Sequence, residues 1–233
     1  MALQILTDRT NNALSFRGVN ASVDIGNTAT FNITGALSFE FWAKQPTSSA
    51  ARQLIYRLDS TNGYQFDSNA GTLRFVYRSS TAVKVTETTE TWHDDRWHHV
   101  AVTYNASDSN RVILYVDGVA LKNQTNVGAM TGTASLNCFI GNLSSGGSTN
   151  NWAGDMCEVR IWNTTRTVVE ITANMYKRVL GNETGLVAYF PMDEGTGTTI
   201  TDRSTNSNNG TAVGSPTWIN GAPIQGSGAI LIN

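Results

Sequence analysis

The stretch Leu37-Ser-Phe-Glu-Phe-Trp-Ala-Lys44 alternates residue by residue and indicates the fold class. In an extended chain, successive side chains point to opposite faces of a sheet. One face of this stretch carries Leu37, Phe39, Phe41 and Ala43, and the other carries Ser38, Glu40, Trp42 and Lys44. The pattern predicts a half-buried β-strand, with the first face in a hydrophobic core and the second outside it.

The same period of two recurs along most of the chain. It covers residues 73–78, 112–116 and 156–162, and turn-forming Ser, Asn and Gly separate such runs. Asp117-Gly118 follows the second of these runs, and Asp-Gly is a strong signal for a tight hairpin. Many short strands between turns are typical of an all-β sandwich or barrel.

One segment departs from this period. Over residues 168–180 the apolar side chains recur at helical spacing. Thr167 and Glu170 have the spacing of an N-terminal capping box, and Gly181 suits the C-terminal end. We expect a single short helix here, acting as a lid or as a crossover between two sheets.

The composition fits a single soluble β domain. Of the 233 residues, 40% are hydrophobic, which is enough for a core, and only 15% are charged, against about 25% in an average chain. Thr, Asn and Ser occupy 72 positions, and these residues suit exposed strand faces and turns. The length allows one large β domain or two small ones, and the absence of a linker or repeat favours one.

Several classes of function are disfavoured by the sequence. The net charge is −2 and no basic run exceeds two residues, so the sequence lacks the footprint of a nucleic-acid-binding protein. No apolar run approaches the roughly 20 residues of a membrane-spanning helix. The N-terminus shows no signal peptide.

An ordered set of motifs resembles one family. They include Trp97-His-His-Val-Ala-Val-Thr-Tyr104 and Gly154-Asp-Met-Cys-Glu-Val-Arg-Ile-Trp-Asn163, and the others lie at residues 13–20, 37–42, 114–118, 140–141 and 185–195. Together they resemble laminin-G-like, pentraxin-like jelly rolls of the concanavalin A type. The resemblance implies a two-sheet sandwich over residues 13–225, flanked by an extension at 1–12 and a tail at 226–233.

Catalysis is not expected. The laminarinase-type glycosidases of this superfold resemble one another in a Glu-x-Asp-x-x-Glu strand, whose acids face one cleft. Here the only close acid pair on a strand-like run is Glu87 and Glu90, whose odd spacing puts them on opposite faces. Nucleophile, zinc and phosphate-loop motifs are absent as well.

The resemblance points to calcium as the cofactor to consider. Pentraxin-like members bind it through an Asp and an Asn in one loop and several acids in a second. Asp59 and Asn62 match the first loop, but residues 142–151, which match the second, contain no carboxylate. Residues 202–208 offer oxygens at alternate positions, which indicates either a calcium loop or Asx turns.

Cysteine and histidine pairs give two further expectations. If residues 138–141 and 155–162 form a hairpin, Cys138 and Cys157 face each other and are either a disulfide or two buried thiols. His98 and His99 are adjacent on a predicted strand, point to opposite faces and therefore cannot chelate one metal. Glu158 and Arg160 share a strand face and can pair.

Sugar binding needs an aromatic surface beside amide and hydroxyl groups. Two loops combine these groups, and Trp42 lies on the polar face of its strand. The candidate ligand-binding residues are Asp59, Asn62, Tyr64, Asn150, Asn151 and Trp152. Packing in the core or at its rim is the alternative role for the aromatic members.

We therefore expect a non-catalytic recognition module for glycans or a protein surface. It could be a component of a larger particle, such as a virion decoration or tail-associated protein, or a secreted or cell-surface adhesion module. A glycoside hydrolase is the third class. In the particle hypothesis the protein is oligomeric, lies at a virion surface or outside the cell, and uses its tail at 226–233 as a docking strand.

Overall fold

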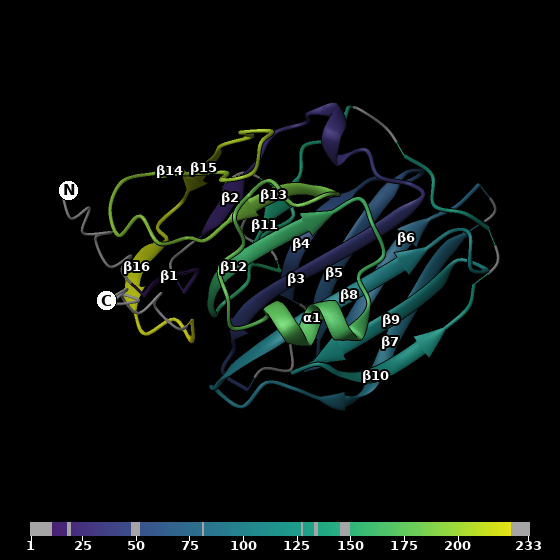
Figure 1. The fold of residues 1–233 in the computed structure, drawn as a ribbon, viewed down its shortest axis with the longest axis horizontal. Coiled ribbons are helices and arrows are strands. Elements are labelled where there is room, and N and C mark those ends of the chain that lie inside the picture. Colours follow the sequence, from purple (N-terminus) through teal and green to yellow (C-terminus); the bar gives the residue numbers. More distant parts are fainter. Residues whose placement is uncertain are drawn as a thin grey trace, which may run out of the picture.

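The computed structural model describes residues 11–17, 20–47, 52–80, 82–126, 128–132, 135–144 and 150–224. Within these residues the chain forms two antiparallel sheets of eight strands each, packed as a sandwich (Figure 1). This confirms the predicted jelly-roll fold. Of the predicted extension at 1–12, residues 1–10 lie outside the described residues, and Asn12 already belongs to the first strand. The predicted docking tail at 226–233 also lies outside the described residues.

Sheet A has the strand order β10-β9-β8-β3-β12-β1-β16, with β13 also paired to β12. Its strands are β1 (Asn12–Ser15), β3 (Ala36–Lys44), β8 (Trp97–Asn105), β9 (Arg111–Val116), β10 (Val119–Gln124), β12 (Asp155–Trp162), β13 (Leu186–Phe190) and β16 (Thr217–Asn220). The predicted turn at Asp117-Gly118 joins β9 to β10, which pair as a hairpin.

Sheet B has the order β14-β15-β2-β11-β4-β5-β6-β7. Its strands are β2 (Ser22–Asp24), β4 (Arg52–Leu58), β5 (Gly63–Asn69), β6 (Thr72–Arg78), β7 (Val83–Thr91), β11 (Phe139–Ile140), β14 (Thr199–Ile200) and β15 (Gly210–Val213). A short 3-10 helix, η1 (Ala29–Phe31), precedes β3, and α1 (Val168–Asn174), the one α-helix of the described residues, follows β12.

The core lies between the sheets, where the apolar face of β3 meets β5. Phe39 packs against Tyr64 and Phe41 against Phe66, with ring centroids 5.3 and 5.8 Å apart. All four apolar residues of the predicted inner face of β3 are at most 1% exposed. Burying such a set supplies most of the favourable free energy of folding.

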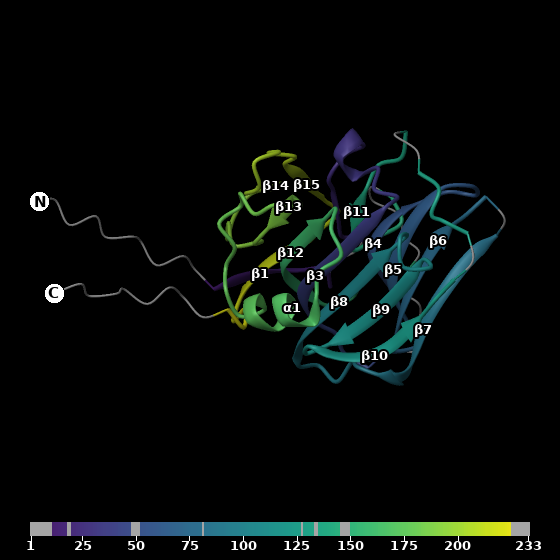
Figure 2. The ribbon, with the colours of Figure 1, turned by 45° about the vertical axis from the view of Figure 1, so that its right-hand side comes forward.

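The other face of β3 is also buried, which the sequence pattern did not indicate. Ser38, Glu40 and Trp42 are at most 3% exposed. Figures 1 and 2 show α1 lying over this face of sheet A, with sheet B on the far side. Ile171 of α1 packs there against Ala101 of β8. The helical segment is therefore a cover on the outside of sheet A.

The helix is shorter than the predicted span of 168–180. Its predicted capping box is present, with Glu170 N–H donating to the Thr167 hydroxyl at 3.2 Å. After Asn174 the backbone carbonyls turn to partners in sheet A. The indole of Trp42 donates to Met175 O at 2.6 Å, and Arg160 donates to Lys177 O. These bonds replace the next helical turn and hold the segment flat on the sheet.

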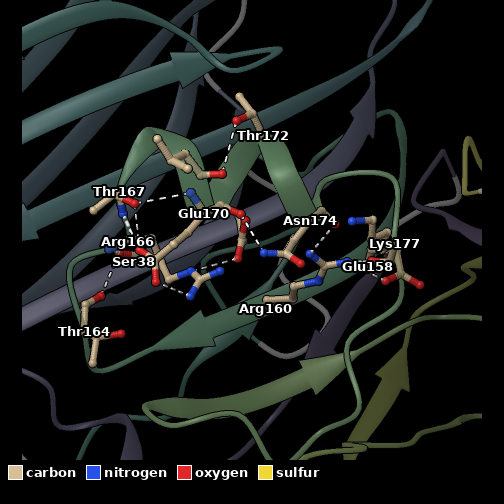
Figure 3. A network of polar contacts seen from close by, with 12 residues as sticks. Ser38, Glu158, Arg160, Thr164, Arg166, Thr167, Glu170, Thr172, Asn174 and Lys177 are labelled. Atoms are coloured by element: carbon tan, nitrogen blue, oxygen red, sulfur yellow. Dashed lines mark hydrogen bonds and ion pairs between the residues drawn. The ribbon is translucent and has the colours of Figure 1, made fainter.

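A layer of buried charges lies between this cover and sheet A (Figure 3). Arg160 donates to the Glu158 carboxylate at 3.0 Å and to Asn174 O at 3.1 Å, which confirms the predicted pair on β12. Arg166 stacks 4.1 Å over the Trp162 ring and binds Glu170 at 3.0 Å. The two carboxylate oxygens of Glu40 accept no hydrogen bond within the described residues, but Oε1 lies 3.7 Å from Arg166 Nε. Burial raises the pKa of the Glu40 carboxyl group, although Arg160 and Arg166 oppose this.

The two adjacent histidines have different surroundings, as predicted from their positions on opposite faces of β8. His98 lies between Asp117 and Asp94, with nitrogen-to-oxygen distances of 2.7 and 3.0 Å. His99 is buried against Trp42 on the face that the helix covers. Burial lowers the pKa of His99 to about 3, and the charge of Arg160 adds to this effect.

We predict that Arg160→Met destabilises the protein strongly. The change leaves Glu158 and Glu40 buried without their main cationic partner, and breaking a buried pair typically costs about 3–5 kcal/mol. Urea unfolding measures this free energy. The control is Arg111→Met, because Arg111 pairs with Asp108 at the surface and such pairs contribute at most about 1 kcal/mol. Equal losses in the two variants would contradict the role given to Arg160.

We also predict a pH-dependent contribution from His98. Its burial lowers its pKa, but the bonds to Asp117 and Asp94 outweigh this and raise the pKa above its ordinary value. Protonated His98 therefore stabilises the folded state fully below the unfolded-state pKa of about 6.5, and this contribution disappears as the pH rises through the folded-state pKa.

NMR titration of the His98 ring should give a midpoint above about 6.5. The difference in unfolding free energy between wild type and His98→Gln should be largest in mildly acidic solution and shrink in alkaline solution. A difference that grows with pH would overturn this assignment.

Candidate functional site

The structure does not bring the predicted ligand-binding residues together. Asp59 and Asn62 lie at the turn after β4. Asn150 lies at the other end of this strand, where its carbonyl accepts from Gln53 N at 2.9 Å. A strand rises about 3.3 Å per residue, so the seven residues of β4 hold the two loops about 20 Å apart. A single site built from both loops is therefore excluded.

The predicted aromatic ligands are core residues. Tyr64 is 1% exposed and donates its hydroxyl to Phe31 O at 2.9 Å. Trp152 is 0% exposed and stacks on Trp92 with centroids 5.9 Å apart. Trp42 is covered by the segment after α1. The prediction that these rings contact a ligand is wrong, because each ring fills the interior or the layer under the helix.

The polar members of the prediction are local turn formers. Asp59 Oδ1 accepts from Thr61 N at 2.6 Å and Asn62 N at 2.7 Å, and these bonds lower the pKa of the Asp59 carboxyl group. The Asn62 side chain donates to the Thr61 hydroxyl. Asn150 is exposed, and the Asn151 carbonyl accepts from Arg52 at 3.2 Å. These contacts stabilise the loops themselves.

The loop at 202–208 does not fit a calcium ion. Asp202 Oδ1 accepts from Tyr189 N and Ser204 N, and its Oδ2 accepts from the Ser204 hydroxyl and Asn208 N. Both oxygens are thus directed at protein donors, as in an Asx turn. In the described part of the chain, no three His, Cys, Asp or Glu side chains are grouped as ligands for one metal ion. Asp59 Oδ1 is likewise directed at the Thr61 and Asn62 N–H groups, and calcium binding by Asp59 and Asn62 stays a prediction.

The predicted hairpin between the two cysteines does not form. Cys138 precedes β11, which pairs with β2 and β4 in sheet B, whereas Cys157 lies on β12 in sheet A. Both residues are free, buried thiols. Burial raises the pKa of Cys138 to about 12, so this thiol is unreactive at neutral pH.

The outer face of sheet B presents a more coherent set of side chains. One row of neighbours crosses five strands of this face through Thr211, Asp24, Phe139, Tyr56 and Gln65. On β2, β11, β4 and β5, the residue next to the one in this row points into the core instead. These core residues are Val23, Ile140, Ile55 and Phe66. The helix lies over the other sheet (Figures 1 and 2). We call the first set the outer row.

An aromatic pair lies in the middle of the outer row. Tyr56 and Phe139 are cross-strand neighbours and are both partly exposed. Beside them lies a polar hollow of about 450 Å³, whose lining includes Asp24, Asn137 and Asn209. The Asp24 carboxylate accepts from Gly26 N at 2.9 Å and from the Asn137 amide at 3.2 Å. The face thus combines aromatic surface with amide and carboxylate groups.

A second row supports the first. Both side-chain oxygens of Asp67 accept from Arg74 at 2.9 Å, and one of them also accepts from Gln65 of the outer row. Burial raises the pKa of Asp67, although Arg74 opposes this. Glu87 accepts from Asn69 at 2.9 Å and from Thr72 at 2.5 Å. These bonds fix strands β5, β6 and β7 beside the outer row.

The sequence patterns do not reveal the aromatic pair. Phe139 belongs to a strand of two residues, which is too short to show a period. Tyr56 follows Leu54-Ile55, where the register of β4 against β5 shifts between Gln53 and Ile55. This bulge breaks the alternation that would have marked Tyr56 as outward-facing. The next residue, Arg57, is charged but buried, so the sequence gives no sign that Tyr56 is the outward-facing residue.

No helix of the described chain is long and apolar enough to cross a membrane. No curated protein matches the sequence. Among solved structures, a Bacteroides ovatus protein described as carbohydrate-binding superposes with a TM-score of 0.72 at 18% identity, over 93% of this chain and 62% of that one. The heptameric SAP-like pentraxin of Limulus polyphemus superposes with a TM-score of 0.64 at 14% identity, over 94% and 99%.

These superpositions establish a shared fold, and the chain spans less than two thirds of the Bacteroides protein. A family model gives the closer relation. Residues 17–172, about two thirds of the chain, match the model described as the concanavalin A-like lectin/glucanases superfamily. The matched part contains most strands of both sheets, including Asp24, Tyr56 and Phe139 of the outer row. The protein therefore belongs to the concanavalin A-like lectin/glucanase superfamily.

Proposed function

We propose that the protein is a carbohydrate-recognition module that binds glycans on the outer face of sheet B without cleaving them. The observation that carries this proposal is the partly exposed pair Tyr56 and Phe139 beside the Asp24 hollow. The pair lies on the outer face of sheet B, whereas α1 covers the outer face of sheet A (Figure 1). The Bacteroides protein, which shares the fold and is described as carbohydrate-binding, is consistent with this function.

The chemistry of the face suits a sugar ring. The C–H face of a pyranose packs against an aromatic ring, and its hydroxyl groups exchange hydrogen bonds with amides and carboxylates. Tyr56 and Phe139 offer the first contact, and Asp24, Asn137 and Asn209 offer the second. Because these side chains stand on or beside paired strands, little conformational entropy is lost when a ligand binds.

The carboxylates of this face favour binding over hydrolysis. The backbones of Asp67 and Glu87 lie on either side of Arg74, two strand spacings or about 10 Å apart. The side-chain oxygens of Glu87 are used by Asn69 and Thr72, which accounts for this carboxylate in the sheet. In addition, Asp67 is fully buried and binds Arg74 through both oxygens. A carboxyl group held in this way cannot approach a glycosidic oxygen.

The proposed ligand indicates where the protein acts. Glycans are displayed mainly outside cells and on their surfaces, so the proposal places the protein there, as an adhesion module or as an attachment component of a virion. A structural role in a larger particle is compatible with this, because α1 and sheet A leave the glycan-binding face of sheet B clear.

We predict that Tyr56→Ala and Phe139→Ala each weaken glycan binding at least about tenfold, equivalent to about 1.4 kcal/mol. Each change removes half of the aromatic surface, and aromatic anchors often dominate a binding site. A glycan array identifies the ligand of the wild type, and titration calorimetry with that ligand measures the variants.

The matched control is Tyr176→Ala. Tyr176 is a 44% exposed tyrosine that follows α1 on the opposite sheet, so its removal should leave glycan affinity unchanged. Wild-type protein that binds no glycan on a broad array would refute the proposed function. Equal losses in all three variants would place the site elsewhere.

A further inference from the structure

Building on the proposed function, we infer that the outer row selects an extended, neutral oligosaccharide and rejects acidic glycans, and that Asp24 is the residue that makes this selection. The inference rests on the charges around the aromatic pair and on the length of the row. It names the ligand class of the site, which neither the family match nor the similar structures specify.

The first support is the charge of Asp24. Its carboxylate accepts from neutral donors only, the Gly26 N–H and the Asn137 amide, and it forms no ion pair within the described residues. Asp24 is a cross-strand neighbour of Phe139, about 5 Å away across the sheet. An anionic group bound over the aromatic pair would lie within the Debye length of this charge, which is about 8 Å at physiological salt.

The second support is that the arginines of this part of sheet B are engaged by the protein. Arg74 binds both oxygens of Asp67. Arg57 is 1% exposed and donates to Leu136 O inside the protein. Arg78 donates to Asp59 O, and the charges of Arg78 and Asp59 act on Tyr56 with opposite signs. Arginine and lysine bind carboxylates and sulfates most strongly. Arg74 and Arg57 are held by acceptors of the protein, and the charge of Arg78 at Tyr56 is opposed by that of Asp59.

The third support is the length of the row. From Asp24 to Gln65 it crosses three strand spacings, or about 14 Å, which is longer than one sugar ring. The aromatic pair can hold one ring while the neighbouring hollow of about 450 Å³ receives the next. The geometry therefore suits an oligosaccharide that lies across the strands.

The test compares neutral and acidic glycans of equal length. Cello- and xylo-oligosaccharides of one to six units serve as neutral probes, oligogalacturonates as acidic ones, and a broad array supplies further pairs. We expect neutral chains to bind more tightly than acidic chains of equal length, with affinity for neutral chains rising from one unit to at least three. If acidic glycans bind as tightly as their neutral partners, the inference is overturned while the proposed function stands. If no glycan binds, the proposed function itself fails.

The substitution Asp24→Asn tests whether the charge of Asp24 causes the preference for neutral glycans. Asparagine keeps an oxygen that can accept from Gly26 N, but it removes the charge. We expect the preference for neutral over acidic glycans to fall about tenfold. The control Asp108→Asn removes a charge from the turn between β8 and β9 of sheet A and should leave the preference unchanged. An unchanged preference in Asp24→Asn overturns the inference.

Salt provides a measurement that needs no variant. If the negative charge of Asp24 repels acidic glycans, added NaCl screens the repulsion, and the residual affinity of wild-type protein for oligogalacturonates should rise. The affinity for neutral chains should stay constant. A fall in affinity for acidic glycans with salt would reveal a cationic site and overturn the inference.

Discussion

The buried guanidinium of Arg160 determines which face of the sandwich is open. It stands on the outer side of sheet A and binds Glu158 together with the carbonyls of Asn174 and Lys177. These bonds draw the segment that contains α1 onto sheet A (Figure 3). With that sheet covered, the aromatic and amide groups suited to a ligand are on sheet B. The position of the proposed site thus depends on an interaction in the other sheet.

Burying these charges costs desolvation energy, and only a well-connected network offsets it. Glu158 also accepts from the Tyr189 hydroxyl at 2.7 Å. Arg178 and Arg203 both bind Asp193, which joins the end of the covering segment to the chain after β13. A purely apolar cover would need a longer amphipathic helix with a continuous apolar stripe. The carbonyls released by ending α1 at Asn174 are the acceptors that the buried cations use.

Local patterns predict the strands well and the surroundings of their outer faces poorly. Alternation correctly placed Leu37 and Phe39 in the core, and the capping box at Thr167 correctly began the helix. The same alternation put Trp42 on an outer face, but it contains no information about what packs on that face. Whether such a side chain meets water or another layer depends on the path of residues 163–185, which is fixed by long-range bonds such as those of Arg160.

Local sequence patterns also failed to predict the candidate site. Loops rich in Asn and Asp looked suitable for ligands, but antiparallel pairing sends the loops at Asp59 and Asn150 to opposite ends of β4, and their polar groups mostly bind their own backbone. Tyr56, Phe139 and Asp24 come from three strands that are far apart in sequence and meet only through sheet pairing. A row fixed in this way is ordered before any ligand arrives. Rigid strands therefore suit it to hold the repeating rings of an extended sugar chain better than either loop alone.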